Sequence, residues 1–128
     1  MNASSSFLLP PVPGLAGTVT GARIVVAGAV GGAGTRYWTF QIINKGTGGS
    51  GTTQVLAATD ANTTKSSTGI NGGAGLTAYA LAAFTLNGTT ANRNVTAGQT
   101  LLLEITKTLM PDDLIDAVVE IDLEITGV

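Results

Sequence analysis

The acidic side chains near the C-terminus are the residues of this chain whose spacing first suggests chemistry. Asp112, Asp113 and Asp116 stand close together, and three more acids alternate along a strand-like segment: Glu120, Asp122 and Glu124. Convergent carboxylates can bind a hard cation such as calcium, or act as acid and base when burial separates their pKa values. Alternate residues of a strand lie about 7 Å apart, which is too far for three of them to share one ion. We therefore predict solvated carboxylates, with the bend at residues 112–116 as the alternative position for a metal.

The groups that would activate a nucleophile are missing. The chain has no histidine and no cysteine, which removes the commonest general base, the thiol nucleophile and the zinc-thiolate site. The glycine-rich run at residues 28–34 does not fit a phosphate-binding loop, because a strand rather than a helix is expected to follow it. We predict that the protein is not an enzyme and holds no cofactor and no metal.

The composition is typical of one small domain with an uneven charge distribution. The chain has 128 residues, of which 18 are glycine and only 11% are charged. Residues 1–100 carry five basic groups and one acidic group, a net charge of +4, and residues 101–128 carry one basic and seven acidic groups, a net charge of −6. We predict no nucleic-acid partner, because the basic residues are scattered, and no membrane partner, because no apolar run is long enough for a span. The acidic end suits an oppositely charged protein, and a merely solvated face is the simpler alternative.

Alternating apolar residues predict an all-β fold. Trp38, Phe40 and Ile42 share the core face of a strand expected at residues 36–45, and Tyr37 lies on the other face. The other expected strands are residues 18–29, 52–57, 99–108 and 116–126, while residues 76–84 suit either a strand or a helical turn. Short strands about ten residues apart are typical of an antiparallel two-sheet sandwich, and we predict a jelly-roll-like one.

The segment at residues 116–126 has the clearest pattern. Its predicted core face consists of Ala117, Val119, Ile121, Leu123 and Ile125. Glu120, Asp122 and Glu124 lie on the opposite face, which an antiparallel sheet buried on one side leaves in water. These three acids are candidate partner-binding residues.

Residues 59–75 form a long polar stretch that is predicted to be a loop containing a short edge strand. Loops of this length in compact domains tend to be functional or poorly ordered. The stretch is therefore a candidate binding loop.

Tyr37 is the one aromatic residue whose strand position points away from the predicted core, and one exposed ring is a weak indication of sugar stacking.

Residues 1–14 are predicted to be an extended arm, and residues 15–128 the folded domain. The arm is uncharged and its prolines favour an extended course. Its candidate partner-binding residues are Phe7, Leu8, Leu9, Pro10 and Pro11. The arm has two possible courses, folding back on its own domain or crossing to a neighbouring subunit.

Several stretches together resemble a known protein family. They are Ile24-Val25-Val26, residues 36–45 (RYWTFQIINK), a Gly/Thr loop, residues 94–104 (NVTAGQTLLLE) and the alternating closing strand. Over most of residues 18–126 the chain resembles the small β-sandwich structural proteins of tailed phages, such as capsid decoration (cement) proteins and head-fibre bases. It departs from them at Gln99, where an Asp often stands.

The resemblance implies a homo-oligomer, often a trimer, seated on the outside of an icosahedral head. We therefore predict a virion structural protein of the capsid surface, made in the host cytoplasm, that stabilises the shell. Its partners would be the major capsid protein and other copies of itself. The alternative is a host-recognition or fibre or tail module that binds a glycan or protein receptor through residues 59–75.

Overall fold

The structure is a computed structural model that describes residues 5–8 and 16–126. Within these residues the regular elements are β-strands and three short 3-10 helices, which confirms the all-β prediction. The strands are β1 (Ser5–Leu8), β2 (Ala16–Val25), β3 (Val30–Gly31), β4 (Tyr37–Asn44), β5 (Thr53–Gln54), β6 (Gly75–Leu76), β7 (Ala82–Ala83), β8 (Asn94–Val95), β9 (Leu101–Thr108) and β10 (Val118–Thr126). The 3-10 helices are η1 (Asp60–Asn62), η2 (Ile70–Gly73) and η3 (Thr90–Arg93).

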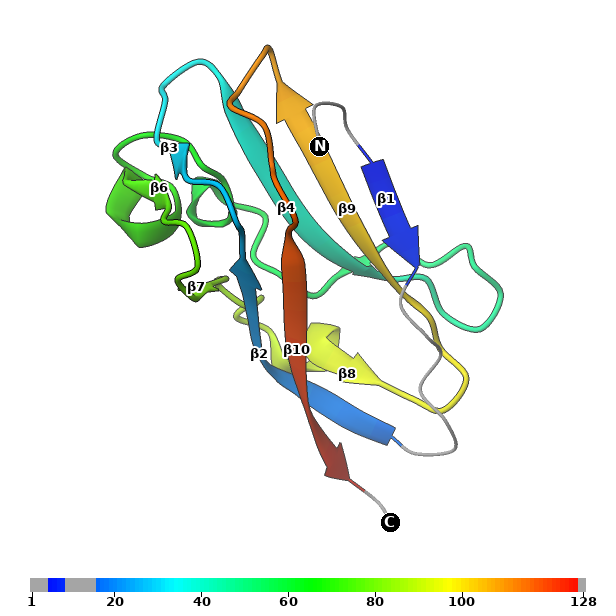
Figure 1. Cartoon of the computed structure of the whole chain (residues 1–128). Coiled ribbons are helices and arrows are strands. Elements are labelled where there is room, and N and C mark those ends of the chain that lie inside the picture. Colours follow the sequence, from blue (N-terminus) through cyan, green and yellow to red (C-terminus); the bar gives the residue numbers. More distant parts are fainter. Residues whose placement is uncertain (1–4, 9–15, 127–128) are drawn as a thin grey trace.

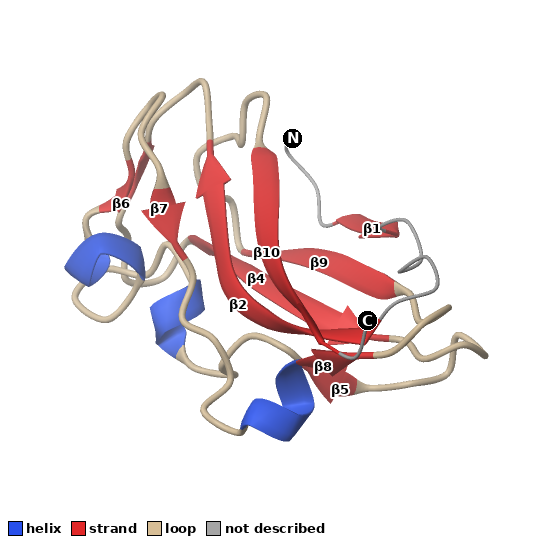
Figure 2. Ribbon diagram, turned by 90° about the horizontal axis from the view of Figure 1, so that it is seen from below, coloured by secondary structure: helices blue, strands red, loops and turns tan. Residues whose placement is uncertain are grey.

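The strands form antiparallel sheets. One sheet has the order β1-β9-β4-β5, a second has the order β10-β2-β7 with β8 also paired to β2, and β3 pairs with β6. The long strands β4 and β9 run side by side, and so do β2 and β10 (Figure 1). The 3-10 helices lie on the flank away from β1 (Figure 2). The several antiparallel sheets agree with the predicted class, and their jelly-roll-like sandwich packing stays a prediction.

Apolar side chains from both larger sheets share one core. Trp38, Phe40 and Ile42 of β4 are fully buried, as their alternation predicted. Buried residues of the neighbouring strands pack in the same cluster; they are Val19 and Ile24 of β2 and Leu101, Leu103 and Ile105 of β9. The Trp38 indole N–H donates a 2.7 Å hydrogen bond to the backbone carbonyl of Asp112. The connection between β9 and β10 is therefore fastened to the core by a buried aromatic residue with a satisfied polar group.

A β-bulge keeps the apolar side chains of β2 on the core side. The pairing of β2 with β10 shifts register so that Thr20 has no partner. Gly17 and Val19 are buried before this point, and Ala22 and Ile24 after it, so the buried positions change from odd to even. One extra residue in one strand of an antiparallel pair produces this change.

The apolar face of β10 is shorter than predicted. Val119, Ile121 and Leu123 are partly buried and pack against the core. Ala117 precedes the strand and is exposed, and Ile125 is also exposed. The partner of Ile125 in β2 is a glycine, which offers no side chain to cover it.

Residues 59–75 are held in place by buried polar side chains. The Asn62 Nδ2 donates 2.8 Å hydrogen bonds to the carbonyls of Ala57 and Thr85, and its Oδ1 accepts from the Thr85 N–H at 2.7 Å. The buried Thr64 hydroxyl accepts a hydrogen bond from the β4 backbone. Two 3-10 helices and single bridges replace the expected edge strand. A fully satisfied polar network can thus order a segment that has little regular secondary structure.

The ambiguous segment at residues 76–84 forms two short strands. Leu76 ends β6, and β7 begins six residues later at Ala82. Between them Tyr79 has φ +58°, a left-handed conformation that ends a strand or helix. Phe84 is buried with its ring centroid 5.3 Å from that of Phe40.

Candidate functional site

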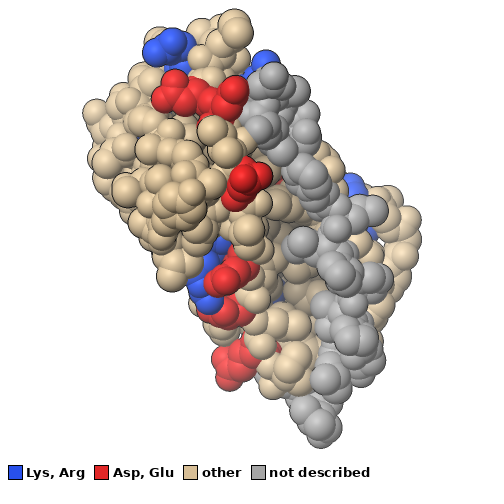
Figure 3. All heavy atoms as spheres, viewed as in Figure 1, with Lys and Arg blue, Asp and Glu red and all other residues tan. Residues whose placement is uncertain are grey.

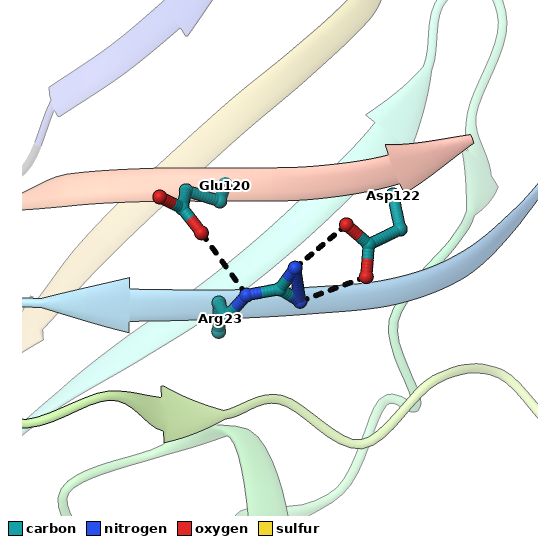
Figure 4. A network of polar contacts seen from close by, with 3 residues as sticks. All are labelled: Arg23, Glu120 and Asp122. Atoms are coloured by element: carbon teal, nitrogen blue, oxygen red, sulfur yellow. Dashed lines mark hydrogen bonds and ion pairs between the residues drawn. The ribbon is translucent and has the colours of Figure 1, made fainter.

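An ion-pair cluster covers the outer face of β2 and β10. Arg23 Nε lies 3.0 Å from Glu120 Oε2, and its two terminal nitrogens lie 2.9 and 2.6 Å from the two oxygens of Asp122. Figure 4 shows the Arg23 guanidinium of β2 between the two carboxylates of β10. Gly21 leaves room for this pair, because a Cβ at Gly21 would lie 2.6 Å from Asp122 Oδ2. Two of the three predicted partner-binding acids therefore have a partner within the chain.

This cluster is exposed, and acidic charge remains around it. The Arg23 side chain is 27% exposed, and those of Glu120 and Asp122 are 56% and 51% exposed. Ion pairs at such positions contribute at most about 1 kcal/mol each. Glu124 forms no ion pair with any residue in the described part of the chain. Acidic groups follow the course of β10 (Figure 3), an arrangement that suits electrostatic steering toward a basic surface.

The N-terminal candidates fall partly within the described residues. Phe7 and Leu8 belong to β1, which pairs antiparallel with β9 of the same chain. Leu9, Pro10 and Pro11 lie outside the described residues. Of the two predicted courses of the arm, β1 follows the one that folds back on its own domain.

Exposed apolar side chains, which the sequence did not predict, lie on the sheet formed by β10, β2 and β7 and in the segments just before β7 and β10. They are Tyr79 (80%), Leu81 (64%), Val118 (57%) and Ile115 (50%). Val118 is the strand partner of Val25, and the pairing of β7 with β2, continued by one residue, places Leu81 on the other side of Val25. We call these five residues the apolar patch. The backbone of Tyr79 and of Ile115 is hydrogen-bonded to the residues that follow Val25, and exposed apolar side chains gathered in this way mark interaction surfaces on soluble domains.

A groove of about 340 Å³ opens on the outer face of the sheet that contains β4 and β9. Tyr37, Thr39 and Gln41 of β4 and Glu104 of β9 line it, together with residues between 54 and 63. Tyr37 therefore lies on the outer face, as its strand position predicted. The groove brings this candidate sugar-stacking residue together with the beginning of the candidate binding loop.

An ion pair stands at the rim of the groove. Lys65 Nζ lies 2.9 Å from Asp60 Oδ2 and 5.7 Å from the centroid of the Tyr37 ring. The hydrogen bond from Lys65 lowers the pKa of Asp60 below its ordinary value of 3.8. The same hydrogen bond raises the pKa of Lys65 above its ordinary value of 10.5. Both side chains are therefore charged throughout the neutral range.

Two other kinds of site have no counterpart in the described residues. Across residues 5–8 and 16–126, no group of three or more metal-ligating side chains lies close enough together to hold an ion. The bend at residues 112–116 thus shows no ligand cluster. No helix in the same residues is long and apolar enough to cross a membrane.

Comparison of the chain with protein-family models, with curated proteins and with solved structures gave no match. Function is therefore inferred from the chain's own residues and their geometry.

Gln41 and Glu104, which line the groove, were not among the candidate residues predicted from the sequence. The period of two places Gln41 on the same face as Tyr37, but no sequence signal indicates that residues 54–63 fold over that face and bury it.

Proposed function

We propose that this protein is a virion structural protein, a capsid decoration protein that binds the outside of a phage head and stabilises the shell. The resemblance described for residues 18–126 supports this function, as do the antiparallel β body and its exposed contact surfaces. A protein that binds only the assembled shell stabilises it by mass action. Such a protein requires a rigid body and a contact surface rather than a reaction centre.

The apolar patch is the observation that carries the proposal. Backbone hydrogen bonds order the chain on both of its sides: the Tyr79 N–H donates to the Val26 carbonyl at 2.8 Å, and the Ala27 N–H donates to the Ile115 carbonyl at 2.9 Å. A surface that is ordered before binding loses less conformational entropy on association. We infer that the major capsid protein covers this patch and that the neighbouring acids of β10 steer the approach.

We also propose a jelly-roll-like sandwich packing and a homo-oligomer, with a trimer as the expected form. The common core to which β2, β4 and β9 contribute supports the packing. The resemblance alone supports the trimer.

Receptor binding is the second candidate function. The groove favours it, because Tyr37 and the start of the candidate binding loop line one cavity. A fibre or tail module would use such a groove to bind a glycan or a protein on the host surface.

Binding to shells tests decoration. The shells would be assembled from the major capsid protein of the same virus, and the bound chain measured by co-sedimentation. Leu81→Ser combined with Val118→Thr should weaken binding by about tenfold or more, because hot-spot residues of this kind dominate interface energies. Ile125→Thr is the matched control, since it changes an exposed aliphatic residue at the other end of β10. Equal binding by the double variant and the control would overturn the assignment of the patch.

Removal of residues 1–13 tests the arm in the same assay. The domain should still fold, because the residues of its described core all follow position 16. Attachment should weaken if the arm is an anchor. A truncated chain that binds shells as tightly as the full chain would exclude that role.

A further inference from the structure

Gln41 is a buried residue whose amide oxygen accepts hydrogen bonds from described residues and whose amide nitrogen donates to none of them. The residue is only 8% exposed. Its Oε1 accepts hydrogen bonds from the backbone N–H groups of Ile42 at 2.9 Å and Leu56 at 3.0 Å. Two donors require an acceptor, so the chemistry of these contacts fixes the oxygen on the inner side and the NH₂ group on the other. No acceptor for this NH₂ group exists among the described residues, and Gln41 lines the groove.

Glu104 provides the complementary group. It is the strand partner of Gln41 across β4 and β9, and it also lines the groove. Its carboxylate forms no hydrogen bond or ion pair with any residue that the structure describes. An oriented donor and a charged acceptor therefore stand side by side on neighbouring strands, and neither has a partner among residues 5–8 and 16–126.

We propose that this groove binds a neutral sugar through two adjacent hydroxyl groups. One hydroxyl oxygen accepts from the Gln41 NH₂ group, and the neighbouring hydroxyl donates to the Glu104 carboxylate. Sugar hydroxyls are both donors and acceptors, as this pairing requires. The Tyr37 ring supplies an apolar wall for the C–H groups of the sugar. A cavity of about 340 Å³ is at the small end of ligand sites and suits one or two sugar rings.

Charged ligands fit these groups less well. An ammonium or guanidinium group has no acceptor for the Gln41 NH₂ group and would leave it unsatisfied. A phosphate or carboxylate would meet the charge of Glu104, which has no ion-pair partner among the residues that the structure describes. A neutral ligand avoids both penalties.

An extended peptide is also disfavoured, because the backbone of β4 is already paired on both sides. β9 pairs with the whole of β4 on one side, and on the other side β5 pairs at its end and Thr63 forms a single bridge with Thr39. Peptides that bind sheets as added strands need an unpaired edge. The groove presents side chains instead.

The proposal goes beyond attachment to a viral shell and stands independently of it, because the groove and the apolar patch share no residue. It gives the second candidate function, receptor binding, a defined ligand class.

Titration of the full chain with neutral sugars, followed by ¹H–¹⁵N NMR, tests the proposal. The probes are glucose, galactose, mannose and N-acetylglucosamine, each added separately at millimolar concentrations. At least one sugar should produce saturable shifts in the Gln41 side-chain NH₂ signals and in the backbone signals of Tyr37 and Glu104. A protein whose signals do not move with any of the four sugars would overturn the proposal. Shifts at Gln41 with the dipeptide glycylglycine amide and not with sugars would also overturn it, in favour of a peptide site.

Glu104→Gln is the matched test of the contact. It preserves the shape of the side chain and removes the charged acceptor, so the affinity for the sugar should fall by about tenfold. Glu124→Gln is the control, because it makes the same change on β10, outside the groove, and should leave the affinity unchanged. Both variants should retain the melting temperature of the parent chain. Equal sugar affinity in the two variants would contradict the assigned role of Glu104.

Discussion

The cluster around Arg23 and the groove around Gln41 are both polar surfaces on the outer face of a sheet, but they differ in how their groups are satisfied. In the cluster, one guanidinium contacts both Glu120 and Asp122, so the polar groups are paired within the chain. In the groove, the NH₂ group of Gln41 and the carboxylate of Glu104 have no partner among the described residues. Paired groups contribute to the structure, whereas oriented and unpaired groups are available to a ligand.

The same difference exists within the Gln41 side chain, between its amide oxygen and its amide nitrogen. The Gln41 oxygen is structural, because it accepts from two buried backbone N–H groups. The Gln41 nitrogen has no acceptor in the described part of the chain and is therefore available to a ligand. Asn62, which underlies the wall of the groove, shows the fully satisfied case, since both ends of its amide are paired within the protein.

Asn62→Leu should have the largest effect, because it removes the groups that hold the wall of the groove. The substitution leaves the Ala57 carbonyl and the Thr85 N–H without their partner and removes one of the two hydrogen bonds to the Thr85 carbonyl, so it should lower the free energy of unfolding by roughly 3 kcal/mol. Chemical denaturation measures the change. Asn92→Leu is the control, because it lies outside this network and should change stability by less than about 0.5 kcal/mol. Similar losses in both variants would show that the network does not order residues 59–75.

Gln41→Met separates the structural part of Gln41 from its binding part. It removes the acceptor for the N–H groups of Ile42 and Leu56 and should cost about 2 kcal/mol of stability. Gln54→Met, at the exposed edge of the same groove, should cost less than about 0.5 kcal/mol. If Gln41→Met is as stable as the parent chain, the Gln41 oxygen has no structural role and the amide is not held in one orientation.

Arg23→Met removes the guanidinium group that pairs with Glu120 and Asp122, and leaves both carboxylates without this partner. The free energy of unfolding should fall by about 1 kcal/mol or less, because the ion pairs are exposed. The difference from the parent chain should shrink at high salt, which screens surface charges. Arg36→Met is the control for loss of a positive charge. A large loss that does not depend on salt would mean that packing rather than charge holds the cluster together.

The Asp60–Lys65 pair should give the smallest effect, and one that depends on pH. The lowered pKa of Asp60 stabilises the folded chain above the unfolded pKa, and this contribution is lost as the pH falls through the folded pKa, below about 4. The raised pKa of Lys65 has the same ion pair as its cause, so at the alkaline end this contribution is lost as the pH rises above about 10.5. The melting temperatures of the parent chain and of Asp60→Asn should therefore differ by a constant amount between those limits and converge below pH 4. A difference that persists at lower pH would contradict this account.

The sequence predicts most of the strands that carry the core. Trp38, Phe40 and Ile42 alternate without interruption, so the period of two identifies both β4 and its buried face. The bulge in β2 is different, because Thr20 shifts the pattern by one residue and makes the two halves of the strand look unrelated. Tyr79 likewise breaks residues 76–84 with a left-handed conformation that no local pattern marks.

The groove is harder to predict than the strands. Tyr37 was identified from its position on the outer face of β4. The period of two places Gln41 on the same face, and Gln41 is buried because residues 54–63 fold back over it. Asn62 orders that segment through contacts with Ala57 and Thr85, and a contact between residues 23 positions apart leaves no signal in one sequence.

The most direct test of the proposed function is the number of copies of this chain in purified virus particles, measured by quantitative mass spectrometry against the major shell protein. Decoration predicts a number comparable to the number of shell subunits. A number between a few and a few tens would contradict decoration, and it would favour a fibre or tail component in which the groove contacts a receptor.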